Sequence, residues 1–154
     1  MSRPQKPRRP PPPGGFGMIS IKFEIPGRIP GKERSRNSSR GGHYTPDKTR
    51  SAETTIALLS RGVMYGPPFK GPVLCKVDFW ITPPASWGEK RRLEAIGKFI
   101  DVKPDLDNAY KTILDGCEKG GVFARGDSQV AVKVASKRYA ARDRVVVSLR
   151  SLSA

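Results

Sequence analysis

The chain has 154 residues, with 29 Lys and Arg against 14 Asp and Glu, for a formal net charge of +15. Its length allows one domain with a real core, and the sequence has no apolar run of about 18 residues that would form a membrane-spanning helix. So large a positive charge predicts an anionic partner. Nucleic acid is favoured over a membrane surface because no strongly amphipathic basic helix is evident. We expect a cytoplasmic protein, since the N-terminus lacks the apolar segment of a signal peptide.

The first 17 residues differ in composition from the rest. They contain six prolines, three glycines and four Lys or Arg, and so little apolar area does not offset the entropy lost on ordering. We predict a disordered basic arm over residues 1–17 and a single domain over residues 18–154. The arm either contacts DNA loosely or is a solvated tail, and its composition does not distinguish the two.

The first half of the domain reads as strand, helix, strand. Alternating apolar residues predict strands over residues 18–25 and 73–81. Between them, a glycine-rich basic loop runs to about residue 50, and apolar residues at helical spacing predict a helix over residues 49–64. Cys75 and Cys117 fall in apolar periodic segments, so we expect buried free thiols rather than a disulfide.

The second half adds helices and two more strands. A short basic helix, capped by Ser86, is predicted to end near Ile96, and a stronger apolar stripe predicts a helix over residues 106–119. Residues 130–139 and 144–152 alternate again, which predicts a closing hairpin. The order indicates an α/β (α+β) fold with one mixed sheet packed by helices.

The segment over residues 103–130 carries the candidate chemistry. Asp105 and Asp107 follow a proline, Lys111 comes one helical turn later, and Asp127 lies between a glycine and the next strand. One interpretation is ordinary helix chemistry, in which an aspartate caps the helix and Asp107, Lys111 and Asp115 form a ladder on a solvated face. The other is a metal site, because two carboxylates this close repel unless a cation lies between them.

If Asp105, Asp107 and Asp127 meet at one end of the sheet, they form a set of hard oxygen ligands suited to Mg²⁺, with Mn²⁺ able to substitute. Such an ion lowers the pKa of a bound water and neutralises charge on a phosphodiester. Lys111 could then stabilise the transition state as a compact positive charge. In a strongly basic chain these acids point to a metal-dependent nuclease.

At these residues the sequence resembles the RusA-type Holliday junction resolvases. The matching elements are Pro104-Asp105-Leu106-Asp107-Asn108, Lys111, Asp115, and Asp127-Ser128-Gln129-Val130. The resemblance implies a RusA-like fold and a homodimeric, Mg²⁺-dependent endonuclease that resolves four-way DNA junctions by paired symmetric nicks. Members of the family are often encoded by phages or prophages, which implies the cytoplasm of a bacterial or phage-infected host cell.

The resemblance also implies residue roles. Asp105, Asp107 and Asp127 match the metal-binding acids, and Lys111 matches the catalytic lysine. The family often has a second aspartate directly before the Asp-x-Gln element, where this chain has Gly126. We expect activity to survive this departure, with lower metal affinity or rate.

Further residues are candidates for contacts with DNA. The phosphate-binding candidates are Arg34, Arg36, Arg40, Lys48 and Lys103. Trp80 and Trp87 either stack on DNA bases or pack at the rim of the core. The apolar faces of the last strands are candidates for the dimer interface.

Two other functions stay open from the sequence. One is a non-catalytic DNA- or RNA-binding protein whose acids only cap and ladder a helix. The other is a general Mg²⁺ nuclease without preference for branched DNA.

Overall fold

Four strands form one mixed sheet in the computed structural model, which describes residues 19–31, 36–37, 43–44 and 47–152. The strands are β1 (Ser20–Pro26), β4 (Val73–Ile81), β5 (Val130–Tyr139) and β6 (Arg144–Ser151). Their order across the sheet is β1-β6-β4-β5, with β4 and β5 parallel and the other neighbours antiparallel. A separate two-stranded ribbon pairs β2 (Arg36–Asn37) with β3 (His43–Tyr44). The predicted fold class is confirmed.

The predicted hairpin between the last two strands is wrong. β5 and β6 both form, but β4 lies between them and pairs with each. Alternation in a sequence reports which face a side chain occupies and does not report the neighbouring strand. Every second residue of β4 is buried, from Val73 to Ile81. This apolar strand takes a central position and leaves β5 at the edge of the sheet.

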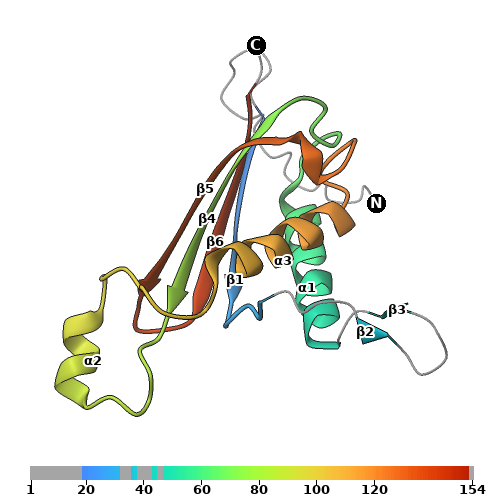
Figure 1. The fold of residues 1–154 in the computed structure, drawn as a ribbon. Coiled ribbons are helices and arrows are strands. Elements are labelled where there is room, and N and C mark those ends of the chain that lie inside the picture. The colour runs from blue at the N-terminus through green and yellow to red at the C-terminus, as the bar shows by residue number, and fades with distance from the viewer. Residues whose placement is uncertain (1–18, 32–35, 38–42, 45–46, 153–154) are drawn as a thin grey trace, which may run out of the picture.

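The helices lie mainly on one face of this sheet (Figure 1). Helix α1 (Asp47–Val63) packs against α3 (Leu106–Lys119) and β1, and α3 also contacts β5. The short helix α2 (Glu89–Ala95) lies beyond the end of β4, and its N-cap is Gly88 with no side-chain cap, rather than the predicted Ser86. In the described part of the chain, no helix is both long enough and apolar enough to cross a bilayer.

The two ends of helix α3 and its buried face follow from its sequence. The side chain of Asp105 accepts a hydrogen bond from the backbone N–H of Asn108 at 3.1 Å, which satisfies one of the free donors at the helix start. Gly120 forms the other end. The predicted bounds are those observed, and the predicted apolar stripe is buried at Tyr110, Ile113 and Cys117. The opposite, polar edge of the helix is therefore left for chemistry.

Both cysteines are free and buried, as predicted. Burial raises the pKa of the Cys75 thiol to about 11 and also raises the pKa of Cys117. At neutral pH both are therefore thiols rather than thiolates, which makes them unreactive core residues.

Helices α1 and α3 approach each other closely at Gly116. A Cβ atom placed there would lie 2.5 Å from Cβ of Ile56, a side chain that is fully buried. We expect Gly116→Ala to lower the free energy of unfolding by about 1–3 kcal/mol, because the core has no room for a methyl group. Urea denaturation measures this change.

Gly62 is the matched control, since it also lies in a helix but has no atom within 4 Å of its ideal Cβ. Gly62→Ala should leave the stability unchanged or raise it by up to about 1 kcal/mol through helix propensity. Equal effects of the two substitutions would contradict the packing of α1 on α3.

Candidate active site

The polar edge of α3 runs alongside β5, in the opposite direction. Along this edge the helix places Asp107, Lys111, Asp115 and Glu118 at helical spacing. The facing residues are Asp127, in the turn just before β5, and Lys133, in the first half of β5. We call these six residues the α3–β5 seam.

Lys111 is the centre of the seam. Its Nζ lies 2.7 Å from Oδ2 of Asp127 and 3.2 Å from Oδ1 of Asp115. The hydrogen bond to Asp127, more than any other contact, raises the pKa of Lys111. The lysine is therefore a fixed positive charge between two carboxylates, and not a proton acceptor near neutral pH.

Asp107 pairs with a residue that sequence reasoning did not select. Its Oδ1 accepts from Nζ of Lys133 at 2.7 Å, and the same Nζ lies 4.5 Å from the ring centroid of Tyr110. The expected ladder from Asp107 to Lys111 is thus replaced by a bond across to β5. Asp107 stays 85% exposed, so its carboxylate is accessible to a ligand from solvent.

Asp105 lies outside the α3–β5 seam, at the N-terminal end of α3, and caps the helix. The chain leading to it is held by Lys137, whose Nζ donates to the carbonyl oxygens of Val102 and, at 2.8 Å, Pro104. The peptide bond between Lys103 and Pro104 is cis. Asp105 therefore has a defined structural role in addition to any role in chemistry.

The structure gathers a different set of carboxylates from the predicted one. In the described part of the chain, ligand atoms of Asp115, Glu118 and Asp127 lie within 4.8 Å of one another. Opposite oxygen ligands of Mg²⁺ are about 4.2 Å apart, because each lies about 2.1 Å from the ion. Carboxylate oxygens within 4.8 Å of one another could share a small divalent ion. Asp127 belongs to both sets, whereas Asp105 and Asp107 lie outside the gathered one.

Gly126 explains why Glu118 joins this group. Its φ of +96° lies in the region that favours glycine, and a Cβ there would come 2.8 Å from Oε1 of Glu118. The Glu118 carboxylate thus occupies the space that a side chain at position 126 would need. The Glu118 carboxylate therefore lies close to position 126, where RusA-type resolvases often have a second aspartate.

Three residues of this region were missed from the sequence, namely Glu118, Lys133 and Lys137. Glu118 carried a weak signal, because it continues the edge of Asp107, Lys111 and Asp115 at helical spacing. The two lysines were not selected, since their approach to α3 depends on β5 lying at the edge beside it.

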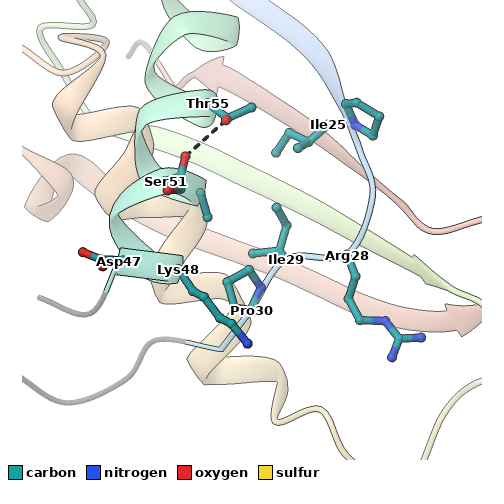
Figure 2. Close-up of a pocket in the computed structure, with 10 residues that line it drawn as sticks. Ile25, Arg28, Ile29, Pro30, Asp47, Lys48, Ser51 and Thr55 are labelled. Carbon is teal, nitrogen blue, oxygen red and sulfur yellow. Dashed lines mark hydrogen bonds between the residues drawn. The ribbon is translucent and has the colours of Figure 1, made fainter.

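The residues predicted to bind DNA are only partly described. Arg34 and Arg40 lie outside the described residues, as does the side chain of Arg36. Lys103 is exposed next to the helix start, and Lys48 is exposed at the start of α1. Lys48 and Arg28 line a pocket of about 630 Å³ beside Ile29 and Pro30 (Figure 2).

Comparison with known proteins identifies one family. The profile of the family described as "Endodeoxyribonuclease RusA" matches residues 26–150, which is well over half of the chain. No curated protein matches the sequence with significance. The match includes every residue of the α3–β5 seam, the helix cap and the segment that leads into it.

The two roles of Asp105 can be separated by substitution. We expect Asp105→Ala to lower the free energy of unfolding by about 1 kcal/mol, because the cap is lost. Asp105→Asn keeps an equivalent cap and should leave stability unchanged, while removing the charge that a metal ion requires. Thermal melts and DNA cleavage assays on both variants provide the measurement. An Asn variant that cleaves like the unmodified protein would limit Asp105 to capping.

Proposed function

Because the chain belongs to the RusA family and is therefore an endodeoxyribonuclease that acts on crossover junctions, we propose that it makes paired, symmetric nicks in four-way junctions with Mg²⁺. Family membership removes the alternative of a non-catalytic binding protein. The observation that carries the proposal is the position of Lys111 between the carboxylates of Asp115 and Asp127. The two carboxylates that hold the Lys111 ammonium stabilise positive charge at this point, although the protein as a whole is basic.

Asp127 is the proposed metal ligand shared by both possible sets. The resemblance supports Asp105 and Asp107 as its partners, and the side chain of Asp107, which is exposed beside Lys133, has room to turn. The distances support Asp115 and Glu118 instead. Mn²⁺ should substitute, because both sets consist of hard oxygen donors. When bound, the ion would activate a water molecule and neutralise charge on the scissile phosphate.

Lys111 supplies the protein's own electrostatic contribution. Its raised pKa keeps the ammonium protonated at neutral pH, so it would stabilise the charge that develops on the phosphate or on the leaving oxygen. Lys133 provides a second ammonium across the seam. Each ammonium is a compact charge, so it can contact a phosphate oxygen without a particular orientation of the phosphate group.

The proposed DNA path passes the start of α3. The carbonyl of Pro30 accepts a hydrogen bond from Oγ1 of Thr112 at 3.3 Å, so the chain that enters the basic loop is attached to this helix. Lys48 follows Pro30 and Lys103 precedes Thr112 in the sequence. We propose that they contact phosphates together with Arg34, Arg36 and Arg40.

We further propose a homodimer, because two cuts in a junction with near two-fold symmetry require two related sites. The apolar residues of β6, such as Val147, are buried under the helices and do not form such an interface. Val132 and Val134 on β5 are 41% and 43% exposed and provide a better candidate surface. From the family's hosts we propose that the enzyme acts in bacterial or phage-infected cytoplasm.

The direct test is cleavage of a four-way junction with the nicks mapped on all four strands. We expect two nicks placed symmetrically in Mg²⁺ and none in EDTA, because the ion is needed to activate the attacking water. Linear duplex of the same sequence serves as the control substrate. Equal affinity and equal cleavage for both DNAs would favour the general Mg²⁺ nuclease over the junction resolvase.

Two substitutions decide which acids accompany Asp127. If the set is Asp105, Asp107 and Asp127, Asp107→Asn should lower cleavage about 100-fold or more, since the loss of a metal ligand removes several kcal/mol of transition-state stabilisation. Glu118→Gln should then have a small effect. The reverse result would assign the ion to Asp115, Glu118 and Asp127.

Junction binding in EDTA is the control for both variants. The affinity for the junction should change little, because each substitution removes one negative charge from a protein with a net charge of +15. Full cleavage by both variants and by Asp127→Asn would overturn the proposed metal site.

A further inference from the structure

The sheet has a second charged feature on the face opposite α1 and α3. Arg144 on β6, Trp80 on β4 and Arg138 on β5 are direct register partners, and Phe99 forms an antiparallel bridge with Arg138. Residues paired in this way lie on the same face of a sheet. We call these four residues the arginine–aromatic row.

The side chains of this row contact one another in alternation. The guanidinium of Arg138 lies 4.2 Å from the ring centroid of Phe99 and 5.9 Å from that of Trp80. The guanidinium of Arg144 lies 5.1 Å from the ring centroid of Trp80. An arginine stacked on a ring can still donate its N–H groups at the edge of the guanidinium plane, and Nη1 of Arg144 lies 3.9 Å from Oε2 of Glu24.

Phe99 is the exposed end of the row. It is 67% exposed, although it is held at the sheet edge by backbone hydrogen bonds that its neighbours make with β5, from Ile100 N–H to the Lys137 carbonyl and from Tyr139 N–H to the Lys98 carbonyl. A large aromatic ring fixed by its backbone and open to solvent is an unusual use of apolar surface. It suits a ligand with a flat face.

Beside Phe99 lies a small hollow of about 220 Å³. Apart from Ala95, it is lined by aromatic and charged side chains, namely Trp87, Arg91, Glu94, Lys98, Phe99 and Tyr139. The rings of Trp87 and Tyr139 are 5.5 Å apart, and the guanidinium of Arg91 lies 3.7 Å above Trp87. Glu94 would repel a phosphate here but could accept hydrogen bonds from the amino group of a base.

The row is connected to the candidate active site by a short stretch of chain. Phe99 and Asp105 are six residues apart, so at most about 20 Å of extended chain separates them. Between them the chain crosses the edge of β5, where Lys137 holds it from the helix-covered side. A DNA strand that passes over this edge can contact both features.

We propose that the arginine–aromatic row binds unpaired deoxynucleotides, as a nucleic-acid contact separate from the α3–β5 seam. Phe99 stacks on a base, and Arg138 and Arg144 bind the adjoining phosphates. Stacking requires a base free of its own duplex neighbour, so the row selects single-stranded or splayed DNA over intact duplex. The proposal rests on DNA being the substrate, which follows from the family, and not on the metal site.

The test is anisotropy of a labelled oligothymidylate and of a blunt duplex, both in EDTA so that no cleavage occurs. Phe99→Ala should weaken binding of the oligothymidylate about tenfold, the size expected for loss of one base–aromatic stack. Duplex affinity should change less than about twofold, since phosphate contacts dominate it. Phe99→Trp should retain the affinity of the unmodified protein, which shows that the ring and not the fold is responsible.

Leu93 on α2 is the matched control, because it too is 67% exposed and lies outside the row. Leu93→Ala should bind both DNAs normally. Unchanged oligothymidylate binding by Phe99→Ala, or an equal loss for both DNAs, would overturn the proposal. Loss of dimer in sedimentation with unchanged DNA binding would overturn it too, and would assign the row to contact between protein copies. None of these outcomes depends on cleavage, so a failed metal site would be recognised separately through Asp127→Asn.

Discussion

The ion pair between Lys111 and Asp127 connects the helix that carries most of the acids to the strand that follows them. Its distance of 2.7 Å joins the middle of α3 to the 3-10 turn η1 (Asp127–Gln129) at the start of β5. Without a cation at this point, the carboxylates of Asp115, Glu118 and Asp127 would repel one another across the seam. The same contact keeps Lys111 protonated, and it holds Asp127 beside Asp115 and Glu118.

The edge position of β5 decides what surrounds this centre. β4 pairs with one side of β5 and, among the described residues, leaves the other side free of a full strand. There, the first half of β5 places Lys133 beside α3, and backbone hydrogen bonds join the second half to the chain that leads to Asp105. One face of the strand thus contributes lysines to the acids, while the other contributes Arg138 to the arginine–aromatic row. The family cuts branched DNA, in which a DNA strand changes direction at the junction. Positive charges on both faces of the edge strand β5 are suited to contact such a DNA strand.

Local features of the fold could be predicted from the sequence. The bounds of β4 and α3 match the prediction, because alternation and helical spacing are properties of neighbouring residues, and Asp105 caps α3 as its sequence indicates. Strand order could not be predicted this way, so the hairpin of β5 and β6 was wrong. The pairing of Asp107 with Lys133 and the approach of Glu118 to Gly126 depend on that order and could not be found without it.

The account requires Asp127 to share its carboxylate between Lys111 and a divalent ion. Anomalous diffraction from crystals soaked in Mn²⁺ tests this most directly, because manganese is located independently of the protein atoms. We predict one strong peak at about 2.2 Å from a carboxylate oxygen of Asp127. Manganese bound elsewhere on the chain, with Asp127 still paired only to Lys111, would contradict the account.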